Sequence, residues 1–155
     1  MSRYQPHFPY RSTFDIRTAL KSLDEDYQAS QRLDEDMQRM AVQLRAAKAA
    51  GLPLVYAVLR REAPLVKVGF SRNLSGPTGR LQRMRGCDLV AVQPGGRDVE
   101  RSIHDRLAGS RVTADLPGYG MTEHFRISDE VMEWINEARA AIGLEPMTKA
   151  YLLSR

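Results

Sequence analysis

The chain has 155 residues, of which 43% are hydrophobic and 27% are charged. These values are typical of a folded domain with its own hydrophobic core, and they exclude a disordered or fibrous chain. No segment reaches the roughly 18 consecutive apolar residues of a membrane-spanning helix, and the one cysteine, Cys87, excludes an internal disulfide. Because the first residues lack the apolar run of a secretory signal, we expect a cytoplasmic protein that does not bind membranes.

Basic residues are concentrated in the middle of the chain. Residues 1–50 carry 8 Lys or Arg against 7 Asp or Glu, whereas residues 51–126 carry 12 against 7, a net charge of +5. Eleven of those 12 basic residues are arginines, whose planar guanidinium group matches phosphate oxygens. The middle of the chain is therefore suited to a nucleic-acid partner.

The first third of the chain is predicted to be helical after a short arm. Residues 1–12 show no hydrophobic periodicity and are interpreted as a flexible arm. Residues 13–50 contain neither Gly nor Pro, and their apolar residues recur at steps of three and four in two stripes of different phase, which predicts one long helix or a helical hairpin that ends at Gly51. Leu-Asp-Glu-Asp occurs twice, at 23–26 and 33–36, and is interpreted as a solvated acidic face.

Strand patterns follow Pro53. Two β-rich runs separated by a turn predict a hairpin, and a third run predicts another strand; the runs are residues 54–59, 65–70 and 88–93. Helices are predicted over residues 77–85, 98–109 and 128–142, a loop over residues 110–122 and a short strand over residues 123–127. We therefore expect an α+β fold in which helices flank a small three-stranded sheet, with one domain over residues 53–142 and a tail over residues 143–155.

Several residues on these elements form an ordered set. The set comprises Leu54-Val55-Tyr56 on the first strand, Lys67-Val68-Gly69 on the second, Arg80 on the next helix, Glu100 and His104 on the helix after it, and then Glu123-His124-Phe125. In order and spacing these residues resemble the motifs of the GIY-YIG nuclease superfamily, and most closely a compact phage and bacterial subgroup with Glu-x-x-x-His on a helix. The resemblance covers residues 53 to about 127.

The resemblance implies a DNA endonuclease that nicks phosphodiester bonds. In such an enzyme Tyr56 is the candidate base, Arg80 binds the transferring phosphate and Glu100 binds Mg²⁺ or Mn²⁺. Lys67, on the adjacent strand of the hairpin, is positioned to lower the pKa of the Tyr56 phenol, and His104 orients the attacking water, contacts the phosphate or holds Glu100 in place. The resemblance also implies that these side chains meet around one scissile phosphate.

The residue types suit that chemistry. One carboxylate can hold a Mg²⁺ ion that keeps several waters and takes the substrate phosphate as a further ligand. Further arginines are candidates for a nucleic-acid track; we select Arg83, Arg85, Arg101 and Arg111, and the wider set includes Arg97 and Arg106.

Two other functions stay open at this stage. Leu54 stands where the family has a glycine, Lys67 where it has a tyrosine and His124 where it has a tryptophan, which allows a non-catalytic nucleic-acid-binding module on the same fold. Alternatively, residues 13–50 pair with a second copy of the chain or with a partner helix, as in an assembly or adaptor protein.

Overall fold

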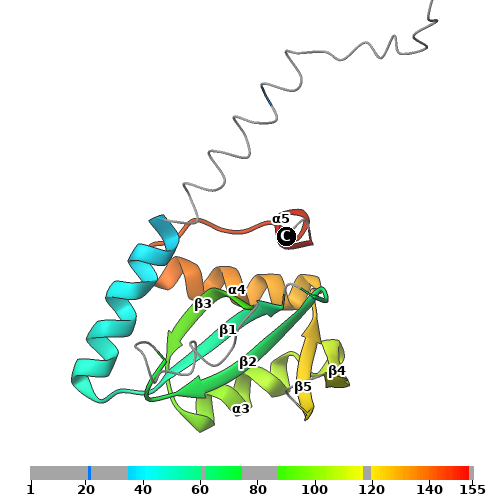
Figure 1. Ribbon diagram of the computed structural model, residues 1–155, viewed down its shortest axis with the longest axis horizontal. Coiled ribbons are helices and arrows are strands. Elements are labelled where there is room, and N and C mark those ends of the chain that lie inside the picture. The colour runs from blue at the N-terminus through cyan, green and yellow to red at the C-terminus, as the bar shows by residue number, and fades with distance from the viewer. Residues whose placement is uncertain (1–20, 22–34, 61, 75–86, 117–119, 154–155) are drawn as a thin grey trace, which may run out of the picture. The chain divides into compact units, whose positions relative to one another are not determined.

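The structure, a computed structural model, describes residue 21 and residues 35–60, 62–74, 87–116 and 120–153 (Figure 1). The chain divides into two units, Met1–Glu35 and Asp36–Arg155, and the fold below is that of the second unit. Within the described ranges, no helix combines the length and the apolar composition needed to cross a bilayer.

The second unit is built on one antiparallel sheet. Its strands, in the order in which they lie side by side, are β3 (Cys87–Pro94), β1 (Leu54–Arg60), β2 (Leu65–Ser71), β5 (Gly120–Arg126) and β4 (Arg111–Leu116). The helices seen in the described part of this unit are one that runs to residue 50, α3 (Arg97–Arg106), α4 (Asp129–Ala141) and α5 (Lys149–Leu153), with a 3₁₀ turn over Ala108–Ser110. The predicted α+β class and the three predicted long strands are confirmed.

The prediction of a three-stranded sheet is wrong, because five strands are present. The predicted loop over residues 110–122 contains β4, which pairs with β5 from Arg111↔Phe125 to Leu116↔Gly120. The sequence of β4, Arg-Val-Thr-Ala-Asp-Leu, alternates polar and apolar residues as a strand does, but Pro117, Gly118 and Gly120 directly after it favour a loop for the whole segment. The helix predicted over residues 77–85 lies outside the described residues.

Side chains of the central strands alternate between two faces of the sheet. The Tyr56 face carries Leu54, Tyr56 and Val58 of β1, which cluster with Leu89 and Val92 of β3. The opposite, Phe70 face carries Val66, Val68 and Phe70 of β2, because alternate residues of a strand point to opposite sides and Tyr56 pairs with Gly69. Each face therefore has its own set of buried side chains.

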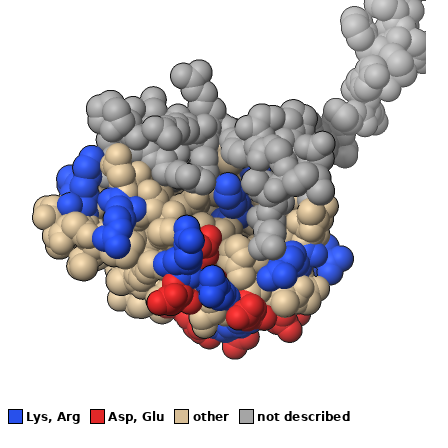
Figure 2. All heavy atoms as spheres, turned by 90° about the horizontal axis from the view of Figure 1, so that it is seen from below, with Lys and Arg blue, Asp and Glu red and all other residues tan. Residues whose placement is uncertain are grey.

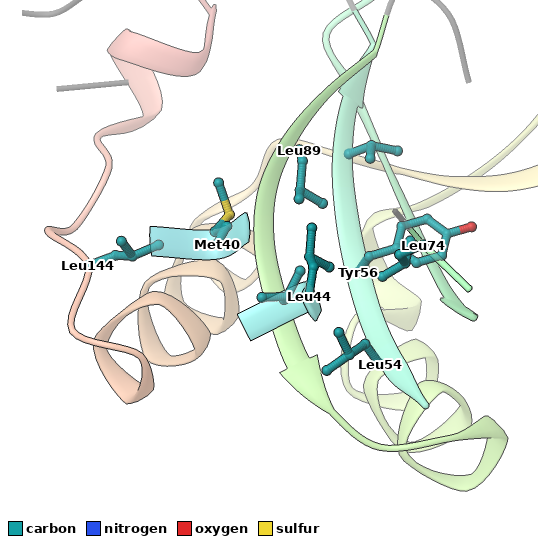
Figure 3. Close-up of a cluster of buried hydrophobic side chains, with 9 residues drawn as sticks. Met40, Leu44, Leu54, Tyr56, Leu74, Leu89 and Leu144 are labelled. Atoms are coloured by element: carbon teal, nitrogen blue, oxygen red, sulfur yellow. The ribbon is translucent and has the colours of Figure 1, made fainter. Parts of the chain in front are cut away.

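Different helices cover the two faces. Met40 and Leu44, from the helix that ends at residue 50, pack into the cluster on the Tyr56 face together with Leu144 (Figure 3). The Phe70 face is covered by α3 and α4, which lie behind the sheet in Figure 1. Trp134 of α4, for example, donates a hydrogen bond from Nε1 to Gln93 Oε1 of β3 (3.1 Å).

The predicted helical segment over residues 13–50 is confirmed where the structure describes it. Residues 35–50 are helical, as is Lys21, and the other residues from 13 to 34 lie outside the described residues. Met40 and Leu44 belong to the second predicted stripe and are 1% and 5% exposed, so this part of the stripe packs on the chain's own sheet.

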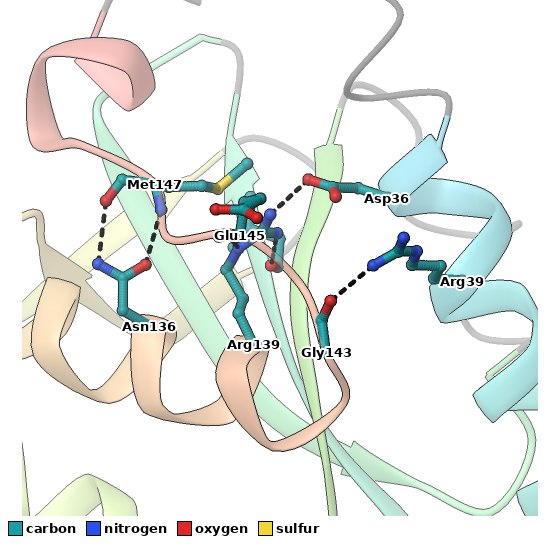
Figure 4. A network of polar contacts seen from close by, with 8 residues as sticks. Asp36, Arg39, Asn136, Arg139, Gly143, Glu145 and Met147 are labelled. Carbon is teal, nitrogen blue, oxygen red and sulfur yellow. Dashed lines mark hydrogen bonds and ion pairs between the residues drawn. The ribbon is translucent and has the colours of Figure 1, made fainter.

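A buried arginine joins these layers at the β3 edge (Figure 4). Arg139 of α4 is fully buried, and its guanidinium donates to three groups: the carboxylate of Asp36, the Val90 carbonyl of β3 (2.9 Å) and the Glu145 carbonyl (2.7 Å). Asp36 belongs to the second Leu-Asp-Glu-Asp, so the interpretation of that motif as a solvated face is wrong at this residue. The charge is buried because Arg139 neutralises it.

We predict that Asp36→Asn lowers the free energy of unfolding by about 3–5 kcal/mol, because it leaves the buried Arg139 without a counter-charge. Urea unfolding followed by the fluorescence of Trp134, the one tryptophan of the chain, measures the loss. The double variant Asp36→Leu/Arg139→Met removes both charges and should be more stable than Asp36→Asn. A single variant as stable as the parent would show that the pair contributes nothing.

Candidate functional site

Glu100 and His104 lie together on α3. They are separated by one helical turn, and His104 Nε2 is 3.9 Å from Glu100 Oε1. Their side chains are 17% (His104) and 22% (Glu100) exposed, so both remain open to solvent. The pairing of this acid and this imidazole that the sequence predicts is present.

The sheet holds the imidazole of His104 in one orientation. Its Nε2 lies 3.0 Å from the Val68 carbonyl of β2, and its ring meets the Phe125 ring edge-on, with centroids 5.1 Å apart. Because a carbonyl only accepts hydrogen bonds, Nε2 is the nitrogen that carries a proton in this contact. The two contacts together fix the orientation of the imidazole.

A hollow of about 460 Å³ surrounds this pair. It is lined by residues of β2, α3 and β4: Phe70, Arg97, Glu100, Arg101, His104, Asp105 and Arg111. Three arginines and two acidic residues thus line one hollow. Figure 2, which views the side on which α3 lies in Figure 1, shows basic and acidic side chains interleaved.

Two of the three arginines have contacts that place them at the hollow. The guanidinium carbon of Arg97 lies 5.5 Å from the centroid of the Phe70 ring, a cation–π distance. Arg111 Nη2 donates to the backbone carbonyl of His104 (3.3 Å). These two contacts bring β2, α3 and β4 to the same space.

Of the four arginines predicted to contact nucleic acid, Arg101 and Arg111 line the hollow, whereas Arg83 and Arg85 lie outside the described residues, as does Arg80. Phe70 and Asp105 also line the hollow and are not among the residues predicted for the site. Arg97, Arg101, His104 and Asp105 recur at helical spacing opposite the apolar stripe of Val99, Ile103 and Leu107, and this polar stripe is the signal that could have located the hollow.

Tyr56 and Lys67 lie on the other face of the sheet from the hollow. The Tyr56 side chain has no exposed surface, and its ring crosses β2 above Gly69, where an added Cβ would lie 2.5 Å from Oη and 2.7 Å from Cζ. Lys67 is partly exposed and lies on the same face of the sheet as Tyr56. It is two residues from Gly69 along β2, which makes it a diagonal neighbour of Tyr56. The structure therefore brings Glu100 and His104 together but separates them from the phenol by the sheet.

The donor groups of the hollow fit a metal held by few protein ligands. Among the described residues, no three His, Cys, Asp or Glu side chains gather as a metal cage. The hollow is lined by two acidic residues of α3, Glu100 and Asp105. Mg²⁺ commonly binds one or two carboxylates, several waters and substrate phosphate, and this set matches that mode.

Arg106, from the wider arginine set, lies in a second hollow between α3 and α4. Its Nη1 and Nη2 donate to both carboxylate oxygens of Glu137 (2.7 and 2.9 Å). This hydrogen bonding is the main cause that lowers the pKa of Glu137 and raises the pKa of Arg106. Arg106 is therefore engaged by α4 and serves as a control for the arginines of the first hollow.

No protein-family model, no curated protein and no solved structure matches the chain.

We predict that Gly69→Ala lowers the free energy of unfolding by about 1–3 kcal/mol, because the new methyl group overlaps a buried tyrosine ring that has no room to move. In a Tyr56→Leu background the same substitution should cost less. Gly109→Ala is the matched control, since a Cβ there meets no atom within 4 Å. Equal losses at Gly69 and Gly109 would contradict the overlap.

We predict that the Arg106–Glu137 pair stabilises the fold at neutral pH and not in acid. The pKa of Glu137 is lowered in the folded chain, so its contribution is present above the ordinary glutamate pKa and is lost as the pH falls through the lowered value. The urea midpoints of the parent and Glu137→Gln should differ slightly at about pH 7 and converge at about pH 3. Because both side chains are exposed, 1 M NaCl should reduce the difference.

Proposed function

We propose that the chain is a Mg²⁺-dependent DNA endonuclease of the GIY-YIG type, with its phosphate site in the hollow on α3. One observation carries the proposal: a solvent-open carboxylate and an oriented imidazole lie among three guanidinium groups in one hollow. Phosphodiester hydrolysis needs these functions, namely a metal ligand, a proton acceptor and cations for the phosphoryl oxygens.

Each residue of the hollow has a separate role in this proposal. Glu100 would hold Mg²⁺, which supplies Lewis-acid stabilisation and lowers the pKa of bound water when it is present. His104, which lines the hollow beside Glu100, is the proposed proton acceptor. Arg101 and Arg111 neutralise the phosphate and fix its position.

In this proposal His104, and not Tyr56, acts as the proton acceptor. A phenol without exposed surface, on the far face of the sheet, has no direct path to a phosphate in the hollow. Tyr56 instead fills the space above Gly69, which explains why a glycine follows Val68. Lys67, on the Tyr56 face, is likewise left out of the hydrolysis, and Arg80 keeps its assignment as a phosphate ligand from the family resemblance.

A non-catalytic nucleic-acid-binding module is the second candidate. It is favoured by the burial of Tyr56 away from the hollow, since the hollow then lacks the phenol that the family resemblance implies. Both candidates use the same arginines, so cleavage and binding must be measured separately.

We predict that Mg²⁺-dependent nicking of supercoiled plasmid falls at least about a hundredfold in Glu100→Gln and in His104→Ala, the size of loss typical when one catalytic group is removed. Arg106→Gln, on the same helix but outside the hollow, should nick as the parent does. Thermal melting should confirm that the variants remain folded. Nicking that survives both substitutions in the hollow would refute the enzyme.

We predict that the logarithm of the binding constant for a duplex oligonucleotide, measured in EDTA, falls linearly with the logarithm of the salt concentration. Arg101→Ala should reduce the steepness of this slope by about one unit. Arg106→Gln should leave the slope unchanged. Binding with a steep salt dependence but no nicking in Mg²⁺ would favour the non-catalytic module. A slope that is the same in Arg101→Ala as in the parent would show that nucleic acid does not bind in the hollow.

A further inference from the structure

We propose that Phe70 and Arg97 form a stacking platform for one unpaired base, so that the strand bound in the hollow is single-stranded or locally unpaired. This inference rests on the proposed phosphate-binding function and adds the substrate class, which neither the arginines nor Glu100 determines. It is carried by an aromatic ring and a guanidinium group that meet inside a hollow otherwise lined by charged side chains.

The ring is available at this position because of the strand register. Phe70 is the third residue of the Val66, Val68, Phe70 series, of which the two valines are buried whereas Phe70 is partly exposed. β5 pairs with β2 at Leu65 and Val66, so among the described strands none continues alongside Phe70 on that side. α3 passes beside this end of β2, and Arg97 from its first turn lies over the ring.

Aromatic rings and guanidinium planes are the two groups on which proteins stack nucleobases. In a duplex the faces of each base are covered by neighbouring bases, and a protein reaches only the base edges and the phosphates. A platform that offers a flat surface can therefore be used only by a base that has left the stack.

The hollow is large enough to hold one nucleotide. Its volume of about 460 Å³ lies in the range of roughly 300–1,000 Å³ that is typical of small-molecule sites. Arg101 and Arg111 line the same hollow and provide cations for the backbone phosphates on either side of that nucleotide. A single strand can thus place phosphates on these arginines and a base on the platform at the same time.

The test compares the binding of three probes in EDTA, so that no cleavage occurs: an oligodeoxythymidylate, an abasic oligomer of equal length and a duplex of equal length. The full chain should bind the oligodeoxythymidylate about tenfold more tightly than the abasic oligomer. Phe70→Leu should remove this difference, since leucine keeps the apolar volume but has no ring.

Two lysine substitutions provide matched controls. Arg97→Lys keeps the charge but not the planar group and should weaken the binding of the oligodeoxythymidylate more than that of the abasic oligomer. Arg101→Lys alters a phosphate contact and should affect both oligomers alike. If the parent chain binds the oligodeoxythymidylate and the abasic oligomer equally, the platform is overturned. This outcome does not depend on whether any variant folds.

The outcomes separate this inference from the proposed function. If the base preference is present but plasmid is not nicked in Mg²⁺, the endonuclease fails and the platform stands. If plasmid is nicked while the base preference is absent, or while Phe70→Leu weakens all three probes equally, the platform fails and the endonuclease stands.

Discussion

The buried guanidinium of Arg139 holds the layers of this fold together. It lies at the β3 edge, where the sheet would otherwise offer a free carbonyl at Val90, and it also bonds Asp36 and the Glu145 carbonyl. The helix that carries Asp36 covers the Tyr56 face, whereas α4 covers the Phe70 face. One side chain therefore fixes how both helices sit on the sheet, and an apolar residue at this position would leave the Val90 carbonyl without its donor.

The sheet divides the protein into a core side and a site side. On the Tyr56 face, β1 supplies a fully buried surface, and Gly69 lets the Tyr56 ring lie across the neighbouring strand. On the Phe70 face, α3 is attached to β2 through the contact between His104 and the Val68 carbonyl. The same helix turn that makes this contact also presents Glu100 to solvent, so the packing of α3 determines the geometry of the candidate site.

The arrangement of charge in the hollow limits its chemistry. Three guanidinium groups attract an anion, while the two carboxylates would repel it unless a cation lies between them. A phosphate diester bound together with a divalent metal ion satisfies both requirements. A purely anion-binding surface would need no carboxylate there, and for this reason we prefer the endonuclease to the non-catalytic module.

The sequence by itself determined the local elements and the pairing of Glu100 with His104, because strand alternation, helical stripes and a spacing of four residues are properties of neighbouring residues. It did not show β4, because the Pro and Gly residues that follow favoured a loop, nor the burial of Asp36, whose partner Arg139 is 103 residues away in the chain. The resemblance to the GIY-YIG nuclease superfamily also predicted that Tyr56 lies beside Glu100. Only the tertiary structure showed that Tyr56 and Glu100 lie on opposite sides of the sheet. The face to which a strand residue points depends on how its strand is paired, and this is not visible in the sequence.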